Sequence, residues 1–493
     1  MYYPGKRDFL KLAKKANLIP VYREVLTDFD TPISAFTKID TGDYSFLLES
    51  VEGGERLARY SFLGSRPSLV FSCKGKDIEL REGGAVRRFA AQDPLDELKK
   101  ILSVYRPAHI KGLPRFSGGL VGFMGYDMVR FMEEIPDKNP DDLGVPDAVF
   151  MLTDTILVFD HVDHKIKVVS NVHVKGSASR AYDEALRKID ALISRLKGPA
   201  APQSHLSAPR KGAPAAKLAS NVTQAEFEEM VRAAKAYIKK GDIIQVVLSQ
   251  RLETPVRSQP LQIYRALRSI NPSPYMYYLK IRDFCLVGSS PEIMVRCEDG
   301  LVEVRPIAGT RPRGASEEED GRLIKDLLSD PKEKAEHIML VDLGRNDIGR
   351  VCDYKTVKVS ELMTIEKYSH VMHIVTDVKG RLKNGRDAFD VMRAAFPAGT
   401  VTGAPKVRAM EIIDELENTR RNTYAGCVGY FSFSGNLDCC ITIRTILIKD
   451  KTAYIQAGAG LVADSVPKTE YQETMNKARA LVKAIEMAER GLE

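Results

Sequence analysis

The 493-residue chain contains no tryptophan, no long apolar run and no ordered set of cysteines. A membrane-spanning helix needs about 20 predominantly apolar residues, so we expect no membrane span. Residues 1–16 are charged and amphipathic and have no apolar signal core, which argues against secretion. The seven cysteines are scattered, and an odd number of them favours a reducing compartment over a disulfide framework. We therefore expect a cytoplasmic protein, and we attach no functional meaning to the missing tryptophan.

No block of basic residues is present either, although the formal net charge is +7. Lysine and arginine are interspersed with acidic residues, so we expect no nucleic-acid partner. An anionic small-molecule substrate would account for the net positive charge equally well. The hydrophobic content of 44% and the charged content of 28% are typical of a globular protein.

The chain is long enough for two domains. Residues 198–220 are rich in Ala, Pro, Ser and Gly and lack hydrophobic periodicity, which predicts a linker. It separates an N-terminal domain, residues 1–197, from a C-terminal domain, residues 221–493. Strands and helices do not alternate as βαβ units. We therefore predict an α+β fold of large, mostly antiparallel sheets flanked by helices, in two intimately packed domains.

Local patterns predict the elements of both parts. In the N-terminal part we expect strands over 43–51 and 58–73, a hairpin over 154–174, a helix over 178–196, and close strand packing at the glycines of 118–127. In the C-terminal part we expect strands at 242–254, 275–281, 284–290, 301–307, 371–380, 425–434, 437–449 and 452–459. Helices are expected at 225–240, 260–270, 317–329, 331–346, 386–395, 404–417 and 469–489. Asn221 or Thr223 can cap the first of these helices and Gly241 can end it, and Asp330 with Pro331 can start the helix at 331–346.

Two of these helices begin with the same Glu-x-x-Glu pattern, Glu333/Glu336 and Glu470/Glu473. A spacing of three places both carboxylates of a pair on one helical face. Two such faces opposite each other would suit Mg²⁺, which takes one or two protein carboxylates beside water and substrate oxygens. A pair of solvated acidic faces is the alternative, and Glu333 can also cap its own helix behind Asp330.

Three further segments are suited to binding an anion. In residues 304–314, Gly309 and Thr310 are followed by Arg311 and Arg313. Residues 396–413 place glycines before a helix, and residues 456–462 form a third small-residue loop. Arg444 interrupts an apolar strand and needs an anionic partner, either a structural carboxylate or a substrate carboxylate. His373 lies among apolar residues, as a core histidine or a proton-transfer group, and His370 is nearby.

Together these segments resemble the chorismate-utilising enzymes, and in particular their anthranilate synthase component I branch. The resemblance rests on PIAGTRPRG, EHIMLVDLGRNDIGRV, YSHVMHIVTDVKG, GTVTGAPKVRAMEII, GCVGYF, CITIRT, QAGAGLVADSVP and ETMNKARA, which follow one another through most of residues 221–485. RYSFLG (59–64) and GGLVGFMGYD (118–127) match the N-terminal part of the family.

The resemblance implies a Mg²⁺-dependent enzyme that adds ammonia to C2 of chorismate, expels the C4 hydroxyl and eliminates pyruvate to give anthranilate. By position it implies Glu336 and Glu473 as metal ligands, with Glu333 and Glu470 in support. It implies Glu292 as the acid for the departing hydroxyl, His373 as the base that removes the C2 proton, and Thr400 in the same site. The chorismate-binding groups implied are Gly309, Thr310, Tyr430, Arg444, Gly458, Ala459 and Gly460.

Two positions distinguish branches of the family. Ala308 stands where aminodeoxychorismate synthases usually carry a nucleophilic lysine, and Gln245 stands where isochorismate synthases use a lysine to activate water. The alternatives are an aminodeoxychorismate synthase component I and a non-catalytic tryptophan-binding regulatory paralogue.

The resemblance also implies feedback inhibition and a partner. Ser50, Pro274, Tyr275 and Met276 match the family's L-tryptophan inhibitor site. The chain contains no glutaminase segment, so we expect ammonia from a separate glutaminase subunit.

Overall fold

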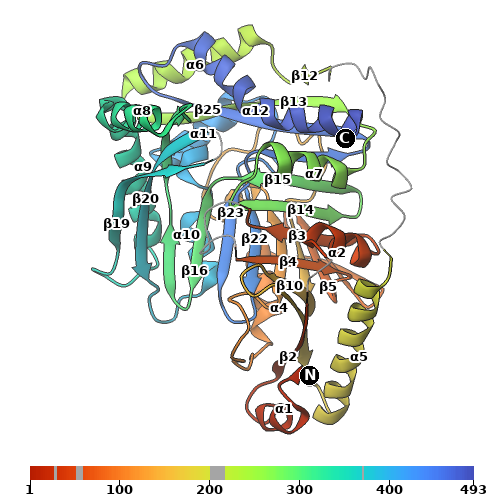
Figure 1. The fold of residues 1–493 in the computed structure, drawn as a ribbon. Coiled ribbons are helices and arrows are strands. Elements are labelled where there is room, and N and C mark those ends of the chain that lie inside the picture. Colours follow the sequence, from red (N-terminus) through yellow and green to blue (C-terminus); the bar gives the residue numbers. More distant parts are fainter. Residues whose placement is uncertain (27–29, 52–58, 200–216, 369–370, 493) are drawn as a thin grey trace.

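The structure is a computed structural model that describes residues 1–26, 30–51, 59–199, 217–368 and 371–492. Two large, mostly antiparallel sheets lie against each other, with helices on their outer faces (Figure 1). The predicted α+β fold is therefore confirmed. His370 and most of the predicted linker 198–220 lie outside the described residues, and the division into two domains stays a prediction.

The first sheet combines strands from both ends of the chain. In spatial order it contains β1 (Tyr2–Tyr3), β2 (Leu18–Leu26), β11 (Lys165–His173), β10 (Thr155–Asp160), β4 (Tyr60–Ser65), β3 (Tyr44–Glu49), β14 (Tyr275–Ile281), β15 (Phe284–Ser290), β24 (Thr445–Lys449), β25 (Thr452–Leu461), β13 (Gln245–Pro255) and β12 (Ala219–Ser220), with β21 (Gly403–Ala404) beside β13.

The second sheet is also shared by both parts. Its order is β18 (Ile307–Pro312), β20 (Val371–Arg381), β17 (Leu301–Val304), β16 (Ile293–Glu298), β23 (Leu437–Ile441), β22 (Cys427–Ser432), β8 (Gly119–Met124), β9 (Ala148–Thr153), β5 (Leu69–Lys74), β6 (Asp77–Glu82) and β7 (Ala85–Ala90), with β19 (Lys358–Lys367) beside β20.

Two seams join the parts of the chain that precede and follow residues 198–220. β3 pairs with β14 in the first sheet, and β8 pairs with β22 in the second. A buried cluster between the sheets combines Phe46 and Tyr277 from the first sheet with Phe123 and Val428 from the second. Both sheets are therefore continuous across the two parts of the chain.

Helices cover the two outer faces of this pair of sheets. Their bounds are α1 (Lys6–Leu12), α2 (Pro32–Ile39), α4 (Pro94–Ser103), α5 (Ala178–Lys197), α6 (Gln224–Lys240), α7 (Pro260–Ile270), α8 (Glu317–Ser329), α9 (Pro331–Gly349), α10 (Ala388–Ala395), α11 (Lys406–Leu416) and α12 (Pro467–Arg490), with 3₁₀ turns η1 (Tyr126–Phe131) and η2 (Gly399–Val401). α2, α5, α7 and α12 bury side chains against the first sheet, and α4, α9 and α10 bury theirs against the second (Figure 1).

Several local predictions are confirmed in detail. β14 and β15 have the predicted bounds, and α6 begins after the Thr223 cap and ends at Gly241 with a positive φ of 84°. Gly122 lies so close to β9 that a Cβ there would be 1.9 Å from the carbonyl oxygen of Val149, as expected for close strand packing.

Other predictions are wrong. The single strand expected over 437–449 is two strands, because β23 belongs to the second sheet and β24 to the first. Arg444 lies at the crossing between them, with φ of 51°. The strand expected over 452–459 is confirmed and runs on to Leu461 as β25, whereas the loop expected over 456–462 is wrong, because Gly458, Ala459 and Gly460 pair with β13. Several strands, among them β2, β6, β7, β9, β16 and β19, were not predicted.

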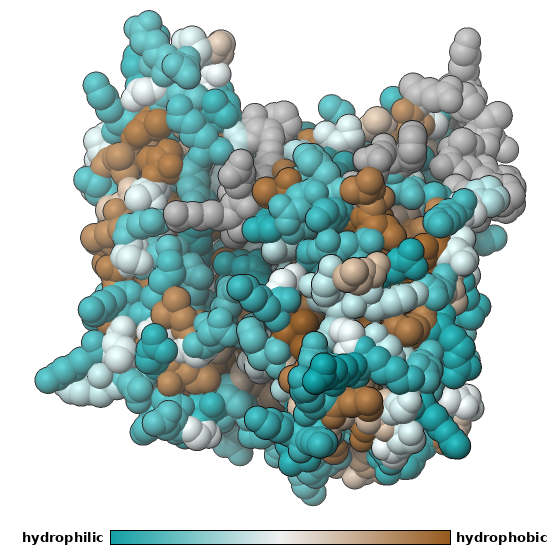
Figure 2. Space-filling model, turned by 60° about the horizontal axis from the view of Figure 1, so that its bottom comes forward, coloured by the Kyte–Doolittle hydropathy of each residue, from teal (hydrophilic) through white to brown (hydrophobic). Residues whose placement is uncertain are grey.

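None of the described helices is long and apolar enough to cross a membrane. On the face shown in Figure 2, hydrophobic side chains form small groups among hydrophilic ones.

Candidate active site

The two Glu-x-x-Glu pairs lie in the first turns of α9 and α12. Asp330 caps α9 and accepts hydrogen bonds from the N–H groups of Lys332 and Glu333, at 3.0 and 3.3 Å. The Glu333 side chain does not cap the helix, since its Oε1 lies 3.0 Å from Nη1 of Arg311. The sequence allowed Glu333 to cap α9, but in the structure its carboxylate forms an ion pair with Arg311 instead.

The remaining carboxylates also have polar neighbours. Gln245, the buried first residue of β13, donates a hydrogen bond from Nε2 to Glu336 Oε1 at 2.9 Å. Glu473 lies 2.6 Å from the ammonium of Lys477 on the same helix. Lys477 in turn donates to the carbonyl of Gly458 at 2.9 Å. α9, α12, β13 and β25 thus meet at one polar centre.

The carboxylates in this centre repel one another. Burial raises the pKa of Glu336, and the charges of Glu333 and Glu473 raise it further, while Gln245 and Lys477 oppose the shift. Burial also raises the pKa of Glu470, with an added contribution from Glu473. A cation between the helices would offset this repulsion.

The donor chemistry of these helices fits Mg²⁺, because all four groups offer carboxylate oxygens. Among the described residues, however, no three His, Cys, Asp or Glu side chains are close enough together to form a metal centre. Glu333 is instead held by Arg311, and Glu473 by Lys477. A bound ion would therefore draw carboxylates away from these partners.

His373 faces the turn of Gly309 and Thr310. A register shift between Ala308 and Thr310 interrupts the pairing of β18 with β20, and Gly309 has φ of 69°. His373 Nδ1 lies 3.0 Å from the Gly309 carbonyl and 3.1 Å from the Thr310 hydroxyl. Because a carbonyl only accepts, Nδ1 carries the proton and Nε2 is the basic nitrogen. Burial lowers the pKa of His373, which keeps the ring neutral.

Arg444 approaches the same centre from the crossing between the sheets. Its Nη1 donates to the carbonyl of Lys477 at 2.5 Å. Burial lowers the pKa of Arg444, and the charge of Glu473 opposes that effect. No side-chain ion pair neutralises Arg444 among the described residues, so its guanidinium remains available to an anionic ligand.

Small residues leave room beside these groups. A Cβ on Gly460 would lie 2.9 Å from Gln245 Nε2, and a Cβ on Gly458 would lie 2.6 Å from the Tyr424 hydroxyl. Ala459 lies between them on β25 and is buried. Gly458 and Gly460 thus have no side chain because Tyr424 and Gln245 come close to β25 at these positions.

Glu292 and Thr400 lie together beside a cavity of about 40 Å³ under α9. Glu292 is buried, and burial raises its pKa to about 8, although the nearby Thr400 hydroxyl and Lys477 ammonium favour the ionised form. The carboxyl group is therefore mostly protonated at neutral pH and can donate a proton.

One predicted substrate group lies elsewhere. Tyr430 is on β22 and lines a different cavity, so the structure separates it from Arg444 and Gly458. Tyr424, which the sequence analysis did not select, has its hydroxyl beside Gly458 instead. Its signal in the sequence is the Tyr-Ala-Gly turn before β22, where Ala425 has φ of 62°.

The cavity that contains Tyr430 has a volume of about 290 Å³ and is called the aromatic cavity below. All four predicted inhibitor-site residues line it, together with groups from both seams: Ser50, Pro274, Tyr275, Met276, Tyr60, Phe62, Arg115, Arg296, Tyr430 and Asp438. Tyr275 donates to Asp438 at 2.8 Å and accepts from Arg296 at 2.9 Å. Ser50 Oγ, Arg115 Nε and Tyr430 Oη are buried without a hydrogen-bond partner among the described residues.

Comparison with known proteins identifies the family. Residues 44–483 match the model of the chorismate binding enzymes. The chain is 52% identical to anthranilate synthase component 1 of Acetivibrio thermocellus, with 99% of both chains covered. It is 51% identical to the protein of that name from Aquifex aeolicus, with 98% of both covered. The crystal structure of anthranilate synthase component I from Streptococcus pneumoniae superposes with a TM-score of 0.77 at 38% identity, covering 93% of this chain and 99% of that one. The chain therefore belongs to the chorismate binding enzyme family.

Proposed function

We propose that this chain is the chorismate-aminating subunit of an anthranilate synthase. It adds ammonia to C2 of chorismate, expels the C4 hydroxyl and eliminates pyruvate, which leaves anthranilate for tryptophan biosynthesis. The convergence of Arg444, His373, Glu292 and the acidic ends of α9 and α12 on one centre carries this proposal. The relatives named for this activity match nearly the whole chain.

The charges of the site suit a dicarboxylate such as chorismate. Bound by Glu336 and Glu473, with Glu333 and Glu470 in support, Mg²⁺ would supply positive charge for one substrate carboxylate. Arg444 binds the other, helped by the backbone at Gly309, the Thr310 hydroxyl and the strand Gly458–Gly460. Tyr424 replaces Tyr430 in this set, because its hydroxyl lies beside Gly458.

Two titratable groups of the centre, Glu292 and His373, differ in protonation at neutral pH: Glu292 carries a proton that it can donate, and His373 has a free nitrogen that can accept one. Glu292 holds its proton at neutral pH and passes it to the C4 oxygen, which leaves as water. His373 is neutral and accepts the C2 proton at Nε2 as enolpyruvate leaves and becomes pyruvate. The environments that shift these two pKa values in opposite directions thus assign one acid and one base.

Two uncharged residues, Gln245 and Ala308, favour ammonia over other nucleophiles. Gln245 cannot deprotonate water as a lysine would, and its amide is engaged with Glu336. Ala308 lies in β18 and offers no nucleophilic side chain. These residues argue against an isochorismate synthase and an aminodeoxychorismate synthase. A separate glutaminase subunit would supply the ammonia, and the chain alone would use free ammonium.

The aromatic cavity is proposed as the site of feedback inhibition by L-tryptophan. Its aromatic walls suit an indole ring, and the volume approaches the lower limit of ordinary ligand pockets, about 300 Å³. Buried polar groups without partners cost free energy unless a ligand or water satisfies them. Ser50, Arg115 and Tyr430 present three such atoms to an amino-acid ligand.

The direct test uses the purified chain with chorismate, Mg²⁺ and an ammonium salt, and records anthranilate fluorescence. We expect Mg²⁺-dependent anthranilate formation that L-tryptophan inhibits. Formation of isochorismate or an aminodeoxychorismate would contradict the assignment. Tryptophan binding without turnover on any nitrogen source would favour the non-catalytic paralogue.

A further inference from the structure

The connection between α11 and β22, residues 417–426, has an unusual backbone. Asn422 has φ of 52° and Ala425 has φ of 62°, so two residues other than glycine adopt the left-handed conformation. Such residues are held by their surroundings at a cost, and they often occur where a functional group must be positioned. Here they flank Tyr424, whose hydroxyl lies beside Gly458 in the candidate active site.

Arg421, in the same segment, is 2% exposed and has several partners. Its Nε and Nη2 donate to the two oxygens of Glu417 at 2.9 and 2.6 Å. Its Nη1 donates to the carbonyl of Val401, and Nη2 donates to the carbonyl of Val247, both at 2.7 Å. A planar, forked guanidinium can make these bonds at once, which a lysine ammonium cannot.

The two carbonyl groups that accept hydrogen bonds from Arg421 belong to elements that carry active-site groups. Val247 is on β13, two residues after Gln245, and Val401 follows Thr400 in η2. Glu417 Oε1 also accepts from the N–H and hydroxyl of Ser249, each at 2.8 Å. The guanidinium carbon lies 5.4 Å from the centre of the Tyr424 ring, which is cation–π distance.

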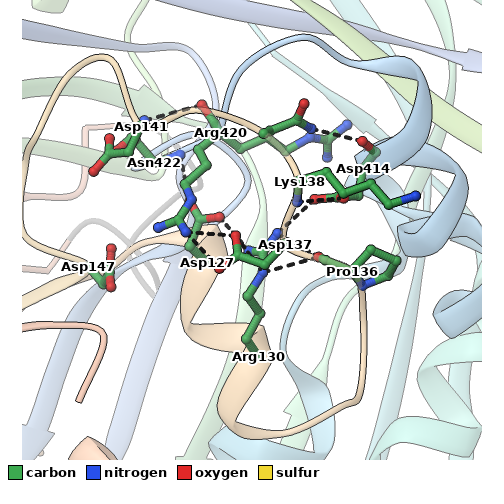
Figure 3. Close-up of polar contacts among 12 residues, drawn as sticks. Asp127, Arg130, Pro136, Asp137, Lys138, Asp141, Asp147, Asp414, Arg420 and Asn422 are labelled. Atoms are coloured by element: carbon green, nitrogen blue, oxygen red, sulfur yellow. Dashed lines mark hydrogen bonds and ion pairs between the residues drawn. The ribbon is translucent and has the colours of Figure 1, made fainter.

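The N-terminal part of the chain also contacts this segment, through Asn422 and Arg420 (Figure 3). Asn422 N–H donates to Asp127 at 3.0 Å, and its carbonyl accepts from Tyr126 N–H at 2.8 Å. Arg130 pairs with both Asp127 and Asp414, at 2.5 and 2.8 Å, and Arg420 pairs with Asp137 at 2.7 Å. The segment that contains Arg421 and Tyr424 is thus held both by the buried contacts of Arg421 and by the N-terminal part of the chain.

We propose that Arg421 is a positioning residue for substrate binding, which fixes Tyr424 against β25 and joins β13 to η2 at the active site. It touches no substrate itself. The inference rests on the proposed function in that Tyr424 contacts the substrate. It predicts that the effect of changing Arg421 depends on the Tyr424 hydroxyl.

The experiment is a double-mutant cycle in the full-length chain with Arg421→Lys and Tyr424→Phe. We expect each single change to raise KM for chorismate by about tenfold, as for loss of a buried hydrogen bond, and to change kcat less than about threefold. In the Tyr424→Phe background, Arg421→Lys should add less than about threefold to KM, because the group that it positions has already been removed. KM for ammonium should stay constant in all variants.

Equal effects of Arg421→Lys in both backgrounds, or a fall in kcat without a change in KM, would overturn the proposal, since a general loss of structure would act in that way. Arg408→Lys is the matched control, because the Arg408 side chain on α11 is 39% exposed and pairs with Glu411. Thermal unfolding of each variant measures how much folded protein is present.

A second variant covers the case in which Arg421→Lys does not fold, since it leaves buried Glu417 partly unpaired. Glu417→Gln with Arg421→Met removes both charges together. We expect it to fold and to bind chorismate about tenfold more weakly by calorimetry. Unchanged affinity in this variant would overturn the proposal. Calorimetry also separates the two hypotheses, because wild-type chain that binds chorismate without forming anthranilate refutes the proposed reaction but not the positioning role.

Discussion

The candidate active site and the aromatic cavity draw on different parts of the chain and use different chemistry. The active-site groups lie between Gln245 and Lys477 and include most of the ionisable side chains discussed above. The aromatic cavity combines residues near Ser50 and Arg115 with residues on β14, β16, β22 and β23. Charged groups with shifted pKa values suit a reaction, whereas aromatic walls with unpartnered polar atoms suit binding.

The two sites are nevertheless joined through short stretches of chain. Tyr275 in the aromatic cavity pairs with Ser290, two residues before Glu292. Cys440 lines the cavity, and Arg444 follows four residues later. A ligand in the aromatic cavity therefore lies within a few residues of an acid and a cation of the active site. The experiments below test whether the two sites have the separate roles that their residues suggest.

The largest effect is expected from the acidic helices. Glu336→Gln or Glu473→Gln should lower Mg²⁺-dependent turnover by about 100-fold or more, because each removes charge from the proposed ion site. Ammonium-dependent anthranilate formation at several Mg²⁺ concentrations measures it, and tryptophan binding should not change. Asp342→Asn is the control, since this α9 carboxylate is 57% exposed. Full activity of Glu336→Gln would refute the metal role.

A smaller but distinctive effect concerns pH. Because the pKa of Glu292 is raised to about 8, its proton is present at neutral pH, and kcat should fall as pH rises through about 8. Glu292→Gln should lower kcat by about 100-fold and abolish that limb of the pH profile. An unchanged alkaline limb in the variant would assign it to another group.

The carboxyl group of Glu292 also affects how the free energy of unfolding depends on pH. The folded state keeps the Glu292 proton to about pH 8, whereas an unfolded glutamate loses it near 4.5. The stability linked to this proton is complete below pH 4.5 and is lost as pH rises through 8. Urea unfolding should therefore show Glu292→Gln gaining stability relative to wild type between pH 5 and 9. A constant difference would contradict the raised pKa.

Tyr424→Phe and Tyr430→Phe test which tyrosine contributes to which of the two sites. Tyr424→Phe should raise KM for chorismate by about tenfold and leave tryptophan inhibition unchanged, because its hydroxyl lies in the active site. Tyr430→Phe should weaken tryptophan inhibition several-fold and spare KM, because its hydroxyl lies in the aromatic cavity. Steady-state kinetics with and without tryptophan decides between them. The reverse pattern would restore Tyr430 to the substrate set.

The smallest effect is expected at Ser50. Ser50→Ala removes one unpartnered polar atom from the aromatic cavity and should weaken tryptophan binding by about fivefold, or about 1 kcal/mol, without changing turnover. Because the chain has no tryptophan, the emission of the bound ligand can be measured directly. An unaltered inhibition curve would place the inhibitor elsewhere.

Local sequence signals predicted much of the fold. Asp330, Pro331 and Thr223 marked helix starts that the structure confirms, and β14 and β15 have the bounds predicted from the sequence. The prediction was wrong at Arg444 because an apolar run looks the same whether it stays in one sheet or crosses to another. It was wrong for Gly458–Gly460 because glycines that favour a loop can also make room in a strand.

The residues of the candidate site were mostly predictable, but their contacts were not. The sequence indicated Glu336 by its Glu-x-x-Glu spacing, His373 by its place among apolar residues, and Arg444 as a charge in an apolar strand that needs an anionic partner. It could not show that Arg311 holds Glu333 or that Tyr424 rather than Tyr430 lies beside Gly458. Those pairings join residues far apart in the chain, and no local pattern encodes them.

The amino-acid sequence by itself determined the α+β composition, the acidic helix starts and the motifs that place the chain in its family, since each depends on neighbouring residues. The tertiary structure alone decided that both sheets run through the two parts of the chain, that Arg444 turns from one sheet to the other, and that Arg421 joins β13, η2 and Tyr424. The physical reason is burial: a charged group far from water takes the partner that the fold brings to it, whatever its distance along the chain.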